Sequence, residues 1–266
     1  DTLSYSEMSK DLSHVLKKEN AWLKEADSIA LQQSLRHLDR AYDNFFKRRG
    51  GYPKFKRKRS AQSYRTMSGN GNISIEGNMI NLPKAGYVKI VNTRIFEGRI
   101  ISATVSRTAS DRYYISLQVE EEFEVLPNKG GEIGIDAGLK SLYTDSDANS
   151  VINPKAFAKH EKRIRRLQRS LSRKQKGSGN REKARRKLAI EHEKVANIRN
   201  DFQHKISYRL ANENQVVCIE DLDVKGMMSD HRLAKAISDA SWSGFYRKLE
   251  YKMADHGGVL IRVPKT

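Results

Sequence analysis

Two stretches decide the fold: residues 132–136 read Glu-Ile-Gly-Ile-Asp, and residues 216–220 read Val-Val-Cys-Ile-Glu. Each is a short apolar run ending in an acidic residue, which is typical of a buried strand whose last side chain reaches an open sheet edge. Carboxylates from two neighbouring strands can share Mg²⁺ ions, which stabilise the attacking water and the leaving oxygen of a phosphodiester. Asp136 and Glu220 are therefore our candidate catalytic and metal-binding residues.

Acidic residues after strands are common, so either carboxylate alone is weak evidence. The order of the surrounding elements is more specific. Two strands are expected after Asp136, at 139–145 and 151–152, followed by two helices and by the strand that carries Glu220. A helix at 234–256 and a strand at 259–263 come last. This is the chain order of the RNase H/RuvC-like nuclease fold.

The helices between the two carboxylates are strongly basic. Residues 159–199 hold sixteen Lys and Arg against four Asp and Glu, and the Gly-containing segment 176–180 breaks them into a helical hairpin. A solvated hairpin would mix both signs of charge, so the excess predicts a phosphate-facing surface. The candidate nucleic-acid-binding residues here are Arg165, Arg166, Arg169, Arg173 and Lys174.

The N-terminal region, residues 1–49, is predicted to be helical and to end at Gly50-Gly51. An apolar stripe on one helix face, which we interpret as core packing, consists of Leu31, Leu35, Leu38, Tyr42 and Phe45. We place the functional interest of this helix away from the stripe.

A basic segment follows at 47–59, with eight Lys and Arg, no acidic residue and two interleaved aromatics. A charge run is often only a solvated face. The added Gly-Gly, Pro and aromatic residues favour a loop that follows a nucleic-acid backbone and offers stacking platforms. The candidate contact residues are Tyr52, Lys54, Phe55, Lys56, Arg57 and Lys58.

Residues 62–125 change character and predict a small antiparallel β barrel or sheet, because short apolar runs alternate with turn signals. The expected strands lie at 72–75, 79–82, 87–91, 99–106 and 113–119. A linker is expected at 127–131.

Composition limits the function classes. The 266 residues are 38% hydrophobic, enough for a folded core, and the formal charge of +18 calls for a polyanionic partner, usually nucleic acid. No run approaches the roughly 20 apolar residues of a membrane-spanning helix, and no signal peptide is visible. The single cysteine, Cys218, is expected to be a buried small hydrophobe in a reducing cytoplasm.

Several long motifs, in order, resemble the TnpB proteins of insertion sequences, relatives of the compact type V CRISPR nucleases. They are GIDAGLKSLYTDSD, LSRKQKGSGNREKARRKLA, NDFQHKISYRLANE, VVCIEDLDVKGM and AISDASWSGFYRKLEYK, with GYPKFKRKRSAQSYRT and WLKEADSIALQQSLRHLDRAYDNFF upstream. The resemblance covers nearly the whole chain. It implies a cytoplasmic, RNA-guided, Mg²⁺-dependent DNA endonuclease, one protein per guide RNA from the transposon end, acting on double-stranded target DNA.

The resemblance also implies an α+β organisation in three parts: a helical recognition lobe at 1–60, a β-barrel wedge domain at 61–128 and a RuvC-like nuclease domain at 129–266. Asp136 and Glu220 match the family's first two catalytic carboxylates. The positions where the family contacts the target-adjacent motif are matched by Tyr5, Ser28, Gln32, Tyr64 and Thr66. Gln and Ser can read base edges, although on a helix they are more often plain surface residues.

The sequence departs from the family in several respects. The family's first wedge strand, expected before residue 1, is missing, and the chain begins at Asp1 rather than Met. The family's four-cysteine zinc finger and third catalytic Asp are absent from these 266 residues, which contain no CxxC. We therefore expect both ends of the chain to be incomplete.

Two alternatives remain. The first is an RNA-guided DNA-binding repressor without cleavage activity, against which the presence of both Asp136 and Glu220 argues. The second is a strand-joining transposase, which is weak because there is no obvious Tyr nucleophile with a metal-binding His pair. The scattered His160, His192 and His204 are interpreted as surface or phosphate-facing residues.

Overall fold

The computed structural model describes residues 4–57, 62–69, 71–91 and 95–264. The chain divides into two compact units, residues 1–122 and 123–266. The N-terminal helices and the sheets that follow them share the first unit. The three-part division at 60/61 and 128/129 stays a prediction.

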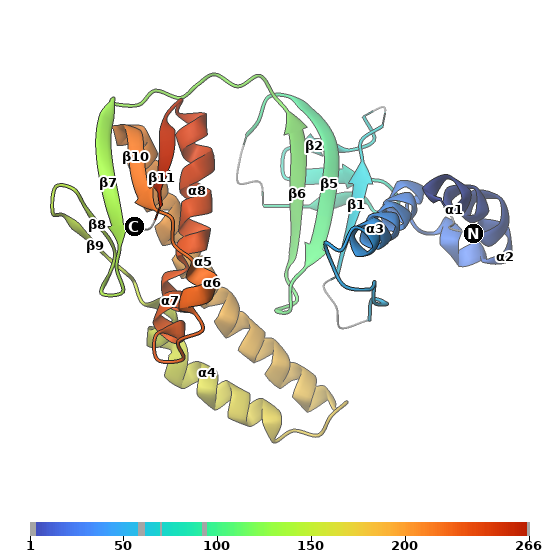
Figure 1. The fold of residues 1–266 in the computed structure, drawn as a ribbon. Helices are drawn as coiled ribbons and strands as arrows, with labels where there is room; N and C mark the ends of the chain where they lie inside the picture. The colour runs from blue at the N-terminus through green and yellow to red at the C-terminus, as the bar shows by residue number, and fades with distance from the viewer. Residues whose placement is uncertain (1–3, 58–61, 70, 92–94, 265–266) are drawn as a thin grey trace. The chain divides into compact units, whose positions relative to one another are not determined.

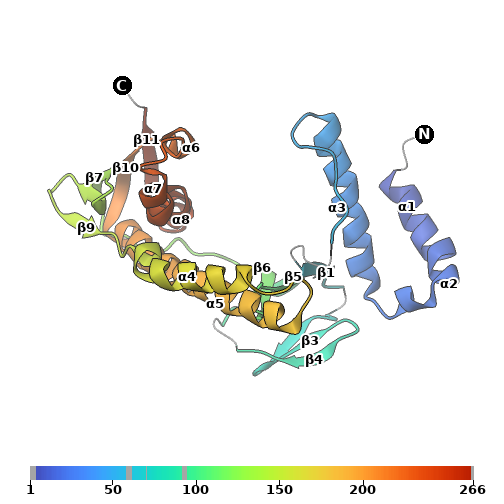
Figure 2. The same ribbon diagram turned by 90° about the horizontal axis from the view of Figure 1, so that it is seen from below.

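The helices of the first unit are short except for the last. They are α1 (Tyr5–Asp11), a π-helical turn η1 (Leu12–Leu16), α2 (Lys17–Glu19), a 3₁₀ turn η2 (Ala21–Lys24) and α3 (Ser28–Phe46). Asp27 caps α3 by accepting a hydrogen bond from the Ile29 amide at 3.1 Å. Helix α1 lies alongside α3 (Figure 2). Helix α3 ends at Phe46, before the expected Gly50-Gly51, and Arg48 just beyond it has a left-handed φ of 56°.

The apolar stripe of α3 is not a core. Gln33 is the one buried residue of this helix, and the five stripe residues are half-buried or exposed. The prediction of core packing for Leu31, Leu35, Leu38, Tyr42 and Phe45 was therefore wrong. An amphipathic pattern shows which face is apolar, but not whether anything covers it.

The β region of the first unit forms two three-stranded antiparallel sheets, ordered β1-β5-β6 and β2-β3-β4. The strands are β1 (Gln62–Met67), β2 (Ser74–Glu76), β3 (Met79–Leu82), β4 (Gly86–Lys89), β5 (Arg99–Arg107) and β6 (Tyr113–Glu120). Ile73, Ile80, Leu82 and Ala103 form the core that joins the two sheets. Within the described residues the strand pairings do not close a barrel, so the wedge barrel stays a prediction.

The second unit is built on one mixed five-stranded sheet ordered β11-β10-β7-β8-β9 (Figure 1). The strands are β7 (Gly131–Ala137), β8 (Ser141–Asp145), β9 (Ser150–Ile152), β10 (Asn214–Glu220) and β11 (Val259–Val263). Strand β10 runs parallel to both β7 and β11, whereas β7, β8 and β9 form an antiparallel meander. The expected strands are therefore present, and β7 and β10 are interior strands.

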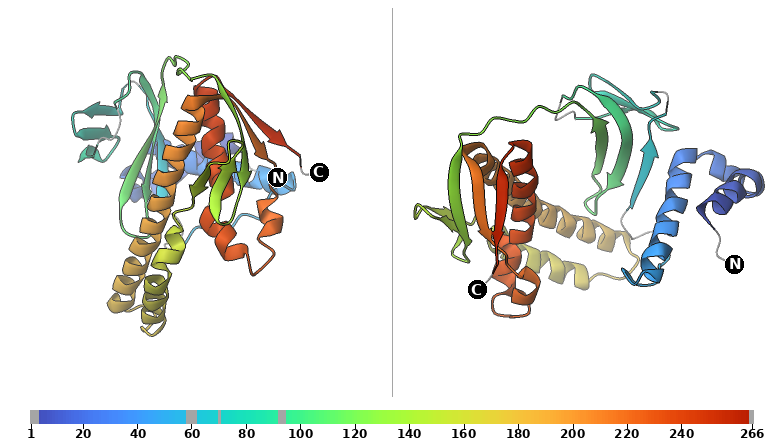
Figure 3. Two further views of the ribbon diagram at one scale, coloured as in Figure 1. Left: turned by 90° about the vertical axis from the view of Figure 1, so that its left-hand side faces the viewer. Right: turned by 45° about the horizontal axis from the view of Figure 1, so that its top comes forward.

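Helices cover one face of this sheet and enclose the core (Figure 3). They are α5 (Gly179–Glu213), α6 (Val224–Met227), α7 (Ala234–Ala240) and α8 (Trp242–Asp255), whereas α4 (Ala156–Ser172) packs against α5 and has a small core of its own. The Trp242 indole donates to the Leu142 carbonyl at 3.0 Å and fixes α8 on the sheet. The single helix expected at 234–256 is split by Ser241, whose φ is 53°.

The predicted basic hairpin is present as α4 and α5, with Ser178 capping α5 at the break. The start of α4 has no cap of its own. Instead the buried Asp239 of α7 accepts hydrogen bonds from the Phe157 and Ala158 amides. Among the described residues, no helix is both long and apolar enough to cross a bilayer.

Candidate nuclease centre and nucleic-acid-binding surfaces

The parallel pairing of β7 with β10 brings the two candidate carboxylates together. Cys218 pairs with Gly134 and Ile219 with Ile135, so Asp136 and Glu220 are the next residues on strands about 5 Å apart. Both line one cleft of about 550 Å³. The cleft is also lined by Gly134, Ile135, Thr144, Asp145, Ser146, Cys218, Ile219, Val263 and Pro264.

The surroundings of the two carboxylates leave them accessible. Asp136 is exposed and Glu220 is half-buried, and neither is packed into hydrocarbon. The third acid of the cleft, Asp145, is occupied by the β8–β9 turn, where it accepts from the amides of Asp147 and Asn149. Cys218 is half-buried against the cleft, which corrects the expectation of a buried core cysteine.

Tyr246 of α8 is a buried residue whose pKa is affected by the charges of both carboxylates. Tyr246 is 5% exposed, and its hydroxyl has no hydrogen-bond partner among the described residues. Burial, followed by the charges of Glu220 and Asp136, raises the pKa of Tyr246 to about 12. This orphaned hydroxyl was not predicted, because a Tyr within an amphipathic helix pattern is ordinary core.

The oxygen donors of Asp136 and Glu220 suit a hard divalent cation such as Mg²⁺. They form a partial set: within the described residues, no group of three or more His, Cys, Asp or Glu side chains is placed to hold a metal ion. The charges of both acids act on the Tyr246 hydroxyl, which has no hydrogen-bond partner among the described residues.

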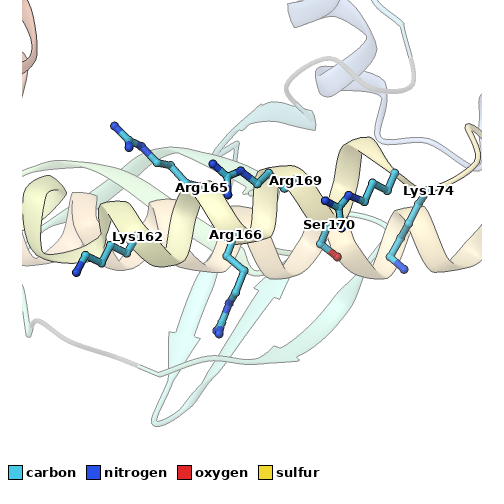
Figure 4. A pocket seen from close by; sticks show the side chains of 7 residues that line it. Lys162, Arg165, Arg166, Arg169, Ser170 and Lys174 are labelled. Atoms are coloured by element: carbon cyan, nitrogen blue, oxygen red, sulfur yellow. The ribbon is translucent and has the colours of Figure 1, made fainter.

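The basic face of α4 forms the second candidate surface. A cleft of about 720 Å³ runs along this helix, lined by Lys162, Arg165, Arg166, Arg169, Ser170, Arg173 and Lys174 (Figure 4). At 100° per residue these side chains span about half of the helix circumference. Lys162 was not among our candidates, although its place four residues before Arg166 is the signal that would have found it.

A buried acid holds α4 against α5. Glu191 of α5 is 2% exposed, and its carboxylate lies 2.7 Å from His160 Nδ1 and 3.0 Å from Arg163 Nε. Burial acts to raise the pKa of Glu191, but the His160 hydrogen bond and the Arg163 charge outweigh it and lower the pKa. His160, expected at the surface or facing phosphate, therefore has a structural partner.

The residues predicted to read the target-adjacent motif lie mostly around α1 and α3. The Arg36 guanidinium stacks over the Tyr5 ring at 4.9 Å, and Lys17 Nζ donates to Ser28 Oγ at 2.8 Å. Gln32 lies one turn after Ser28 and is half-buried.

The two candidates on β1 differ from each other. Burial and the Asp27 charge raise the pKa of the Tyr64 hydroxyl, which places this partly exposed side chain near the start of α3. Thr66 is fully buried, so a contact with nucleic acid would require its surroundings to move.

The basic segment after α3 is exposed. Lys54, Lys56 and Arg57 lie at the surface and Phe55 is fully exposed. Lys58 lies outside the described residues. The roles of all these residues stay predictions.

Comparisons with known proteins agree with the motifs. The "Probable transposase" family OrfB_IS605 matches residues 114–230. A "Putative RNA-guided DNA endonuclease" of Streptomyces pristinaespiralis is 38% identical over 99% of this chain and 66% of the relative. The "Putative RNA-guided DNA endonuclease InsQ" of Escherichia coli K12 is 35% identical over 92% of this chain and 65% of the relative.

The fold also has a solved counterpart. The chain in "Cryo-EM structure of the Cas12f1-sgRNA-target DNA complex" matches with a TM-score of 0.57 at 15% identity, covering 98% of this chain and 66% of that one. The chain is thus similar to this solved protein in its fold, and its own sheet carries two paired acids, Asp136 and Glu220, at one edge. The chain belongs to the TnpB family of insertion-sequence proteins. It spans just under two thirds of the length of these relatives.

Proposed function

We propose that the protein is an RNA-guided DNA endonuclease that cleaves target DNA at a RuvC-like site formed by Asp136 and Glu220, next to a short target-adjacent motif. The observation that carries the proposal is the parallel pairing of β7 and β10, which puts two accessible carboxylates side by side in one cleft. The strand order of the second unit is that of an RNase H/RuvC-like domain. The names of the relatives support the same activity.

The residues of the chain would share the work as follows. Asp136 and Glu220 would hold Mg²⁺, which supplies an activated water and stabilises the leaving oxygen. The basic face of α4 would bind phosphates over about 16 Å, the helix length from Lys162 to Arg173. A guide RNA from the transposon end supplies sequence specificity by base pairing, so the protein needs to read only duplex shape and the adjacent motif.

The target-adjacent motif would be read around α1, α3 and β1. Tyr5, Ser28, Gln32 and Tyr64 offer hydrogen-bonding and stacking groups on neighbouring elements. Amide and hydroxyl side chains of this kind can contact base edges directly.

The test uses the full product of the encoding gene, purified with its RNA. The RNA is sequenced, and the complex is incubated with a plasmid that carries the matching target and with Mg²⁺. We expect a defined RNA and target-dependent cleavage. Asp136→Asn should lower the cleavage rate about 10²- to 10³-fold, on the scale of losing a group that stabilises the transition state, without weakening target binding.

The matched control is Asp147→Asn, in the β8–β9 turn, which removes a charge outside the cleft lining and should cleave normally. Target binding without cleavage by the wild-type complex would support the repressor instead. Recovery of no defined RNA would overturn both functions.

A further inference from the structure

Three residues of the partly exposed α3 stripe, Leu35, Leu38 and Tyr42, line a cleft in the first unit. The cleft, of about 520 Å³, lies between α3 and the segment that follows it. Its lining is Ser34, Leu35, His37, Leu38, Ala41 and Tyr42 on the helix, and Tyr52, Pro53, Lys54, Phe55 and Lys56 opposite. The apolar face that we expected in the core is therefore available to a ligand.

The aromatic end of this cleft is already ordered. The Tyr52 ring packs edge-to-face on Tyr42, with centroids 5.8 Å apart, and on Phe45 at 5.3 Å. The two tyrosine hydroxyls lie 3.4 Å apart. Phe55, in contrast, is fully exposed. Tyr52 thus holds the start of the segment against α3, while Phe55, three residues further along the same segment, presents its whole ring to solvent.

The charge of the cleft selects its ligand. Its lining includes Lys54, Lys56 and His37 and no acidic residue, and the nearby Asp43 is paired with Lys47. A mainly apolar cleft with lysines flanking an exposed ring in the chain matches a nucleobase and its flanking phosphates. An amphipathic protein helix would leave the lysines without partners unless it were acidic.

We propose that this cleft binds one unpaired nucleobase of a single-stranded RNA or DNA segment, stacked on Phe55, with the adjacent phosphates on Lys54 and Lys56. The proposal rests on the proposed function, because an RNA-guided nuclease has unpaired nucleotides to hold. It adds a site for a single base to the general contacts of the basic segment.

The test measures binding of a 12-nucleotide single strand containing 2-aminopurine, whose fluorescence falls when the base stacks. We expect Phe55→Ala to weaken binding about tenfold, within the range for loss of one stacked base, and to relieve the quenching. Phe55→Trp should restore both. Lys54→Ala should reduce the salt dependence of log K by about 0.7.

The matched control is Trp22→Ala, another exposed aromatic residue of the first unit, outside the cleft lining. It should bind as the wild type does. If the wild type binds nucleic acid but Phe55→Ala leaves affinity and quenching unchanged, this proposal is overturned and the cleft is left to a protein partner. If the wild type binds no nucleic acid, the proposed function itself fails.

Discussion

The second unit has a much larger hydrophobic core than the first. The second unit buries Trp242, Phe245 and Leu249 between its sheet and α8, whereas the first leaves Trp22 and Phe55 at its surface. A close-packed core of this kind resists deformation and so keeps the strands in fixed positions. An exposed aromatic surface gains its contacts only when a partner arrives. If the proposed functions hold, the rigid core of the second unit would support the chemistry, and the exposed aromatic residues of the first would bind a ligand.

The largest expected effect comes from comparing the same substitution at two leucines, one in each unit. Leu249 is 0% exposed and Leu38 is 40% exposed. Leu249→Ala should lower the free energy of unfolding by about 3–4 kcal/mol, since it leaves a cavity in a closed core. Leu38→Ala should cost about 0.5 kcal/mol or less. Urea unfolding followed by circular dichroism measures both, and equal losses would mean that α3 is covered after all.

A smaller effect concerns the buried acid of the hairpin. Glu191→Gln should cost about 2 kcal/mol, because His160 and Arg163 lose the charge that they face, and partial exposure of Arg163 moderates the loss. The pKa of Glu191 is lowered by folding from its usual value near 4.5. Its stabilisation is therefore complete above pH 4.5 and is lost as the pH falls through the folded pKa.

The measurement for Glu191 is the unfolding free energy between pH 3 and 7. The wild type should lose stability at the acid end more steeply than Glu191→Gln does. Glu161 contributes acid sensitivity to both proteins, since Lys235 and Arg165 lower its pKa as well. Parallel profiles would show that folding does not shift the pKa of Glu191.

The smallest expected effect tests whether the basic face of α4 binds nucleic acid. Arg169→Ala should weaken duplex binding severalfold at moderate salt and reduce the salt slope of log K by about 0.9, the share of one phosphate contact. Lys205→Ala, on α5 and paired with Asp201, is the control and should leave the slope unchanged. Equal slopes for the wild type and Arg169→Ala would remove the α4 face from the binding surface.

Sequence patterns predicted the second unit well. The largely apolar runs that end in Asp136 and Glu220 predicted neighbouring central strands, and the parallel pairing of these strands places the two acids side by side. The Gly-containing break at 176–180 predicted the hairpin. The inward placement of Glu191 was not predictable, because an acid in a basic helix normally forms surface pairs.

The first unit was harder to predict. Strand β1, with the sequence Gln-Ser-Tyr-Arg-Thr-Met, was missed because its polar residues hide the alternation, and Thr66 is nevertheless fully buried in it. The break at Ser241 in the second unit was also hidden, since a left-handed serine leaves no sequence signal. The exposure of the α3 stripe depends on what packs there, which only the tertiary structure decides.

One junction has a mechanical consequence. Helix α5 ends at Glu213 and β10 begins at Asn214, so no connecting loop separates a rod about 50 Å long from the strand that bears Glu220. The register irregularity between Asn214 and Val216 lies at this joint. A force or rotation applied to the far end of the hairpin is therefore transmitted directly to the strand, because no flexible loop lies between them.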